Sequence, residues 1–155
     1  MSQLDYIDQH IILALKADAR KAFSKIAEDL SISNSLVHQR IKKMKEDGVI
    51  KKADLILDER KIGYNTKSYV GIRLKEARYA SQVVEALNRI EEVTECNYVS
   101  GKYAIFVLIY AKDNDHLRSI LYDKVHEIDG VGGTESFICF TTNFERSIPV
   151  ISGEK

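Results

Sequence analysis

The feature that most constrains the fold is a pair of short helical patterns in residues 22–50, separated by a polar break at residues 31–33. Each pattern repeats apolar residues at helical spacing, which places them on one face. Those of the first pattern are Phe23, Ile26, Ala27 and Leu30, and those of the second are Val37, Ile41 and Met44. Ser33 stands where an N-cap is expected for the second helix, and Gly48 stands just past its end. The short break forces the two predicted helices to cross compactly.

The outer face of the second predicted helix is polar and cationic. At about 100° per residue, the side chains opposite the apolar seam are Ser35, His38, Gln39, Lys42 and, at the margin, Lys43. Residues 32–52 hold six basic and two acidic residues, a net charge of +4, whereas the whole chain is formally neutral. A buried seam backed by cationic and hydrogen-bonding side chains favours a helix that lies in a DNA major groove. We interpret the pair as a helix-turn-helix. The alternative is two amphipathic helices with a solvated outer face.

A third helical pattern precedes this pair and predicts a three-helix unit over about residues 4–48. Its stripe consists of Leu4, Ile7, Ile11, Ile12 and Leu15. Asp5 and Asp8 fall in its first turn, where the helix dipole favours acids. Four basic residues follow before or within the second helix, namely Lys16, Arg20, Lys21 and Lys25. These four either touch the phosphate backbone of DNA or remain solvated.

The rest of the chain alternates between strand and helix patterns. Residues 49–50 and 53–58 are strand-like, and the polar stretch 58–66 marks a boundary between domains at 1–62 and 63–155. Strands are then predicted at 67–75, 93–100, 103–111 and 134–142, with helices at 79–91 and around 117–125. A glycine-rich turn at 130–133 precedes the last strand. The order βαββαβ is typical of a ferredoxin-like sheet with two helices on one face, so the predicted fold class is α+β.

One face of such a sheet is left uncovered by helices. Its outward residues are expected to include some of Tyr69, Gly71, Tyr98, Ile105, Val107 and Ile109. A face this apolar predicts pairing with another copy of the chain. One reading helix contacts only a few base pairs. A homodimer doubles the contacts on a symmetric DNA site.

Composition and spacing speak against several other classes of protein. The four histidines, His10, His38, His116 and His126, have no cysteine or carboxylate at metal or triad spacing, and no glycine-rich phosphate loop is present. We therefore predict no catalysis, no metal site and no cofactor. Cys96 and Cys139 are too few for a disulfide framework and are expected to be buried thiols. Without an apolar run of 18 residues or a signal pattern, the chain is expected in the cytoplasm, away from membranes.

Four segments resemble the Lrp/AsnC, or feast/famine, family of regulators. They are LDYIDQHIILALKADAR (4–20), IAEDLSISNSLVHQRIKKMKEDGVI (26–50), VTECNYVSGKYAIFVLIY (93–110) and IDGVGGTES (128–136). The resemblance implies a winged helix-turn-helix followed by an effector-binding and oligomerisation domain. It also implies assembly of dimers into tetramers or octamers, and control of amino-acid metabolism by a small molecule, commonly an amino acid, bound between dimers.

The resemblance maps the reading helix to residues 34–46. The DNA-binding residues it implies are Ser33, Asn34, Ser35, His38, Gln39, Arg40, Lys42 and Lys43. Gln39 suits adenine N6 and N7, and Lys42 or Lys43 suits guanine or phosphate. Arg40 lies at the edge of the buried seam, so its guanidinium either reaches a phosphate or pairs with an acid inside the domain.

The implied effector site departs from the family pattern. Relatives often carry Gly-Asp-Tyr-Asp between the two central strands, but both acids are missing here. The site residues are Ser100, Gly101, Lys102, Tyr103, Ala104, Thr134, Glu135 and Ser136. Lys102 would repel an ammonium group, and Glu135 is the nearest replacement anion in the sequence. We therefore expect an altered or absent amino-acid response: a ligand without a free ammonium, an anion that pairs with Lys102, or no ligand. The alternative for Lys102 is an exposed hairpin tip without a ligand role.

The predicted function is that of a DNA-binding transcriptional regulator modulated by an amino-acid-like effector. The competing function is an oligomeric, small-molecule-sensing interaction module that does not bind DNA. Salt dependence separates the two, because contacts with phosphates release counterions.

Overall fold

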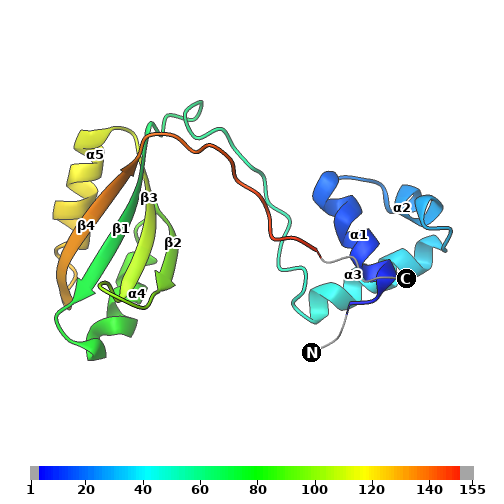
Figure 1. Cartoon of the computed structure of the whole chain (residues 1–155), viewed down its shortest axis with the longest axis horizontal. Helices are drawn as coiled ribbons and strands as arrows, with labels where there is room; N and C mark the ends of the chain where they lie inside the picture. The colour runs from blue at the N-terminus through cyan, green and yellow to red at the C-terminus, as the bar shows by residue number, and fades with distance from the viewer. Residues whose placement is uncertain (1–3, 151–155) are drawn as a thin grey trace. The chain divides into compact units, whose positions relative to one another are not determined.

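The computed structural model describes residues 4–150 and contains two compact units. One unit holds the three N-terminal helices together with the segment that begins at Arg146, and the other is Leu57–Glu145. Figure 1 shows a helical first unit and, in the second, a sheet with helices on one face. None of the helices within residues 4–150 has the length and apolar character needed to cross a membrane.

The first unit is built from α1 (Tyr6–Ala17), α2 (Phe23–Asp29) and α3 (Asn34–Glu46). Its core confirms the predicted apolar seams. The buried residues are Ile11, Ile26, Ala27, Val37, Ile41 and Met44, and Phe23 and Leu30 pack against them half-buried. Burial of this seam stabilises helices that would be too short to persist alone in water.

Local capping explains where the helices begin and end. Asp5 caps α1, and Asp5 and Asp8 form a reciprocal capping box. The Ser33 side chain accepts a hydrogen bond from the Leu36 amide at 3.2 Å, which confirms its predicted place as N-cap of α3. Gly48 follows α3 with a φ of 72°, a left-handed conformation that glycine adopts without strain.

The strand predicted at residues 53–58 is wrong for the single chain. Residues 51–58 contain no regular secondary structure, and Leu55 and Ile56 are exposed. A strand requires hydrogen bonds to a neighbouring strand, and no other segment within residues 4–150 pairs with this one. The apolar residues of this segment therefore lie on exposed, irregular backbone and not in a strand.

The second unit has the predicted order of elements. They are β1 (Thr66–Leu74), the 3₁₀ turn η1 (Ala77–Tyr79), α4 (Ala80–Leu87), β2 (Val93–Tyr98), β3 (Ile105–Ala111), α5 (Asn114–Ser119), the π-helical turn η2 (Ile120–Val125) and β4 (Val131–Cys139). The strands pair antiparallel in the order β2-β3-β1-β4. This arrangement, with α4 and α5 on one face (Figure 1), confirms the ferredoxin-like fold.

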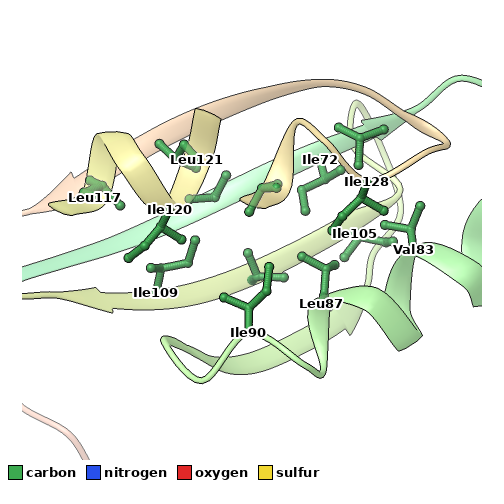
Figure 2. Packing of buried hydrophobic residues seen from close by; sticks show 14 of the residues in the cluster. Ile72, Val83, Leu87, Ile90, Ile105, Ile109, Leu117, Ile120, Leu121 and Ile128 are labelled. Atoms are coloured by element: carbon green, nitrogen blue, oxygen red, sulfur yellow. The ribbon is translucent and has the colours of Figure 1, made fainter. Parts of the chain in front are cut away.

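The core lies between the sheet and the helices. Figure 2 shows Ile105 and Ile109 of β3 facing Leu87 and Ile120 of the helical layer, and all four are fully buried. Tyr98, Ile105, Val107 and Ile109 were among the residues considered for the open face. The last three are buried against the helices, and Tyr98 is in register with Ile105, so the prediction is wrong for all four. Because every residue of β3 is apolar or aromatic, the sequence does not reveal the two-residue phase of the strand.

The open face of the sheet is set by strand register. Tyr69 of β1 pairs with Leu108, and Gly71 pairs with Phe106. On the other side, Tyr69 pairs with Phe137 of β4. The rings of Tyr69, Tyr103, Phe106 and Phe137 form a chain of contacts with centroids 6.1–6.4 Å apart, which we call the open-face aromatic cluster.

The last strand begins earlier than predicted, at Val131 rather than at residue 134. Gly132 and Gly133 belong to β4, opposite a register shift between Arg73 and Leu74. A Cβ at Gly132 would lie 3.1 Å from the Leu74 carbonyl carbon, so the glycine permits close approach of the two backbones. The predicted glycine-rich turn at 130–133 is therefore only partly correct, because residues 131–133 belong to β4.

The two thiols also differ from expectation. Cys96 lies exposed on β2, and Cys139 is half-buried at the end of β4. β2 and β4 are the two edges of the sheet, where one side of each strand has no neighbour. Partial burial of its sulfur raises the pKa of Cys96, so the thiol stays protonated at neutral pH.

Candidate DNA-reading helix and effector site

The outer face of α3 presents the polar side chains that the sequence predicts for DNA reading. Asn34, Ser35, His38, Gln39, Lys42 and Lys43 are all exposed, as is the N-cap Ser33. The side chains of Gln39 and Lys43 form no hydrogen bond or ion pair within residues 4–150, and that of Lys42 makes only a loose, exposed pair with Glu46 at 3.8 Å. These side chains are therefore available to an outside partner.

Two side chains of this face have contacts inside the helical unit. The His38 ring meets Phe23 of α2 edge-on, with centroids 4.8 Å apart. The Ser35 hydroxyl lies 3.0 Å from that of Ser33 at the start of the helix. Both contacts are local, and they leave the N-terminal turn of α3 exposed, where backbone amides favour phosphate.

Arg40 links α3 to α1. Its Nη1 lies 2.5 Å from Asp5 Oδ2 and 3.3 Å from Asp8 Oδ2. The Asp8 amide, which donates to Asp5, holds the pKa of Asp5 below its usual value; slight burial opposes this, and the Arg40 guanidinium lowers the pKa further. The sequence left two roles open for Arg40, a phosphate contact or an ion pair inside the domain. In the structure Arg40 forms the ion pair.

The basic residues near the start of α2 also pair internally. Lys21 lies 2.7 Å from Asp29, and Lys25 lies 2.9 Å from Glu28 and 3.5 Å from Asp29. Solvent screens exposed pairs of this kind, so they contribute little to stability. The charges of Lys21 and Lys25 are therefore balanced by the acidic end of α2, whereas Lys43 of α3 has no acidic partner within residues 4–150.

Three of the predicted effector residues come together at the tip of the β2–β3 hairpin. Lys102 Nζ lies 2.5 Å from Glu135 Oε2, although the two residues are 33 positions apart. The Tyr103 hydroxyl donates a hydrogen bond to the same carboxylate oxygen. The hydrogen bond from Lys102, followed by that from Tyr103, holds the pKa of Glu135 below its usual value.

Gly71 determines where Tyr103 lies. A Cβ at Gly71 would approach three ring carbons of Tyr103 to 2.6–2.7 Å, so the ring rests directly on the β1 backbone. Phe106 and Phe137 confine the ring, with centroids 6.1 and 6.4 Å away. The Tyr103 hydroxyl is therefore aimed at Glu135 by packing as well as by its hydrogen bond.

Two other predicted effector residues face the opposite side of the sheet. Thr134 and Ser136 are in register with the buried residues Ile72 and Val70, whereas Glu135 is in register with Gly71 of the open face. His126 Nε2 lies 2.7 Å from the Thr134 hydroxyl. His126 was not predicted here, because helical spacing gives no indication of a contact with β4.

Two hollows of about 380 and 360 Å³ adjoin on the sheet unit and share Lys67, Tyr110 and Thr142. Lys67 Nζ lies 5.4 Å from the centre of the Tyr110 ring, whose hydroxyl donates to Glu59 at 3.0 Å. None of the predicted effector residues lines either hollow. The sequence did not predict these hollows, because Lys67 lies in a segment that shows only the alternation expected of a strand.

Comparison with known proteins defines the class of this chain. A winged helix-turn-helix DNA-binding model matches residues 4–51, and the Lrp/AsnC ligand binding domain matches residues 67–148. A DNA-binding helical domain joined to a ligand-binding domain defines a transcriptional regulator.

The relatives name the same kind of protein. The regulatory protein AsnC of Haemophilus influenzae is 34% identical over 148 residues, covering 96% of this chain and 99% of that protein. The solved structure of E. coli AsnC is 32% identical, has a TM-score of 0.89, and covers 94% of this chain and 98% of its own. A feast or famine regulatory protein of M. tuberculosis, solved with L-methionine, shares the fold at 23% identity and a TM-score of 0.89, covering 96% of this chain and all of its own.

The chain belongs to the Lrp/AsnC family. It is a DNA-binding transcriptional regulator with an N-terminal helix-turn-helix and a C-terminal effector-binding domain.

Proposed function

We propose that this chain regulates transcription as a homodimer or larger assembly that places two copies of α3 on duplex DNA in the cytoplasm. The observation that carries the proposal is the outer face of α3, where the side chains of Gln39 and Lys43 are exposed and have no partner among the described residues 4–150. This face is backed by a fully buried Val37 and a nearly buried Ile41. Such a helix presents base-reading and phosphate-binding groups from a rigid support.

Each exposed side chain has a distinct proposed role. Gln39 reads adenine through a bidentate amide contact, and Lys42 and Lys43 contact phosphate or guanine. Ser33, Asn34, Ser35 and His38 surround the first turns of α3 and contact phosphate. Arg40 acts indirectly, because its ion pairs with Asp5 and Asp8 fix α3 against α1.

The open-face aromatic cluster is the proposed surface for pairing of two copies. Tyr69 and Phe137 remain 37% and 43% exposed, and they adjoin Phe106 on the uncovered face. Apolar rings left in water on one continuous face favour association. A twofold dimer buries this face and doubles the DNA contacts of each particle. We place the boundary between the DNA-binding and effector domains at residues 62 and 63.

The effector domain is proposed to respond to a small molecule in an altered way. Two proteins of similar fold, from Neisseria meningitidis and M. tuberculosis, have been solved in complex with L-methionine. In this chain Lys102 of the hairpin tip pairs with Glu135 of β4 at 2.5 Å, and Glu135 is the acid available at this site. An amino acid has to compete with Lys102 for that carboxylate, which weakens the ordinary response.

DNA binding is tested by measuring affinity for a selected duplex at several salt concentrations. We expect log affinity to fall steeply with log salt, and Lys43→Ala to make the slope shallower by about one unit. Gln39→Ala is expected to cost roughly 1–3 kcal/mol and to relax one base position. Lys75→Ala is the matched control, because Lys75 lies exposed in the sheet unit beside Asp129.

The competing function, an interaction module without DNA contact, predicts partner binding that salt does not weaken. A monomeric chain, or one that ignores duplex DNA even at low salt, contradicts the proposal. Sedimentation of the full chain provides the oligomeric state in the same buffers.

A further inference from the structure

We propose that Tyr110 is a positioning residue for DNA binding, because it ties together the two segments through which the sheet unit is connected to the rest of the chain. The inference rests on the proposed function, in which two copies of α3 bind one duplex. It concerns four residues that we call the junction network, namely Glu59, Lys67, Tyr110 and Thr142.

The junction network lies where the chain enters and leaves the sheet unit. That unit is Leu57–Glu145, so Glu59 follows shortly after the chain enters it and Thr142 comes shortly before the chain leaves it. Lys67 of β1 and Tyr110 of β3 lie between the two ends and pair with each other in the sheet register. The network therefore belongs to the sheet unit alone and touches both of its connections.

The entry segment forms a tight turn that is fastened to the sheet. The Tyr64 amide donates to the Glu59 carbonyl at 2.9 Å, and the Gly63 amide donates to the Arg60 carbonyl at 3.1 Å. These backbone hydrogen bonds define the shape of the turn. The Tyr110 hydroxyl, which donates to Glu59 Oε1 at 3.0 Å, fastens the turn to β3.

The hydrogen bond between Tyr110 and Glu59 has a charged acceptor. A hydrogen bond from its own backbone amide, followed by that from Tyr110, holds the pKa of Glu59 below its usual value, so the carboxylate is ionised at neutral pH. Hydrogen bonds to an ionised partner are roughly twice as strong as neutral ones. Glu59 is also half-buried, which limits competition from water for this bond.

Lys67 extends the network to the exit segment. Its Nζ lies 5.4 Å from the centre of the Tyr110 ring and donates to the Thr142 hydroxyl at 3.5 Å. Burial lowers the pKa of Lys67, but hydrogen bonding to Tyr110 and the surrounding charges outweigh it, and the net pKa is raised. The ammonium therefore stays charged above the aromatic ring. One phenol ring thus contacts both the entry and the exit side of the network.

A fastened junction limits the directions that the connecting residues 51–56, which have no regular secondary structure, can take from the sheet unit. Two reading helices on one duplex have to meet half-sites about one helical turn apart. Fewer directions raise the effective concentration of the second helix at its half-site. The junction network should therefore strengthen binding to two half-sites and sharpen the selection of their spacing, without changing the contact of one α3 with one half-site.

The test removes one hydroxyl and keeps the ring. Full-length Tyr110→Phe is titrated with three duplexes: a selected duplex with two half-sites, the same duplex with one half-site scrambled, and one with about half a helical turn inserted between the half-sites. We expect its affinity for the selected duplex to fall about three- to tenfold. Its affinity for the single half-site should stay unchanged, and its discrimination against the respaced duplex should fall about threefold.

Two sets of variants control for a general loss of stability. Tyr98→Phe is the matched control, because Tyr98 is 62% exposed and its hydroxyl has no hydrogen bond within residues 4–150. Glu59→Ala should reproduce the behaviour of Tyr110→Phe. Glu59→Gln keeps an acceptor oxygen for Tyr110 and is expected to fall between Glu59→Ala and the parent chain.

Hydrogen exchange reports on the junction without DNA. The amides of Gly63 and Tyr64 should exchange about three- to tenfold faster in Tyr110→Phe than in the parent chain or in Tyr98→Phe. Equal losses of affinity for one and for two half-sites, or unchanged discrimination against the respaced duplex, overturn the inference. A parent chain that binds no duplex contradicts the proposed function, and the exchange rates then decide by themselves whether Tyr110 fastens the junction.

Discussion

The contact between Gly71 and Tyr103 gives the sharpest prediction of stability. In Gly71→Ala the new Cβ would stand 2.6 Å from the Tyr103 ring, whereas ordinary contacts begin at 3.4 Å. The ring must therefore move by about 0.8 Å, the difference between these two distances. Phe106 and Phe137 block this movement, and the hydrogen bond from the Tyr103 hydroxyl to Glu135 is strained or lost.

The magnitude follows from two opposing effects. Overpacking of a confined side chain costs about 1–3 kcal/mol, and replacing glycine by alanine in a strand returns about 0.5–1 kcal/mol. We expect a net loss of about 1–2 kcal/mol from the sheet unit. For a domain of this size the melting temperature falls by roughly 4–8 °C per kcal/mol.

The assay is a double-mutant cycle read out by hydrogen exchange of β1 and β3 amides, because the two units of the chain need not unfold together. In a Tyr103→Ala background, Gly71→Ala should be neutral or slightly stabilising, because the obstructing ring is gone. Tyr103→Phe is the matched control: it keeps the ring and should preserve the full cost. The reasoning is refuted if Gly71→Ala costs the same in the presence and absence of the ring.

Two other predictions concern ion pairs. Arg40→Ala should destabilise the helical unit by about 1 kcal/mol, measured by calorimetry, yet leave the salt slope of DNA binding unchanged, since Arg40 is paired with acids of α1. A shallower slope would instead mean a phosphate contact. Burial raises the pKa of Glu92, but the hydrogen bond from Lys124, a backbone hydrogen bond and the charges of Lys124 and His116 together outweigh it, and the net pKa is lowered from 4.5. Its stabilising contribution is therefore present above pH 4.5 and lost as pH falls through the lower folded-state pKa; Lys124→Met should remove this part of an acid unfolding curve, and an unchanged curve would contradict the assignment.

The helix-turn-helix could be predicted because its signals are local. Ser33, Gly48 and the seam of Val37 and Ile41 lie within one short segment, where helical periodicity and capping leave little freedom. The order of strands and helices followed in the same way from alternating patterns. The fold class was therefore accessible from the residues alone.

The candidate effector site depended on information that the sequence does not carry locally. Lys102 meets Glu135 only because β1 pairs with both β3 and β4 in one register. Thr134 stands next to Glu135 in sequence, yet successive strand residues face opposite sides of a sheet. The family resemblance therefore assigns Thr134 and Glu135 to one site, whereas the strand places them on opposite faces of the sheet.

The open face was assigned poorly for a related reason. β3 is apolar on both sides, so Ile105 and Phe106 appear equivalent in the sequence even though only Ile105 is fully buried against the helices. The extended segment at residues 51–58 shows the converse error. Its composition is strand-like, but no neighbouring strand among the described residues pairs with it, and a strand requires such pairing.

The edge positions of the two thiols have a practical consequence. Cys96 lies on β2 and Cys139 on β4, with β3 and β1 between them. Three strand spacings separate their backbones by at least about 14 Å, which is far beyond the reach of a disulfide. Any covalent link that appears when the folded protein is oxidised must therefore join separate chains. A non-reducing gel then becomes a direct record of which sheet edges meet when copies of this regulator assemble.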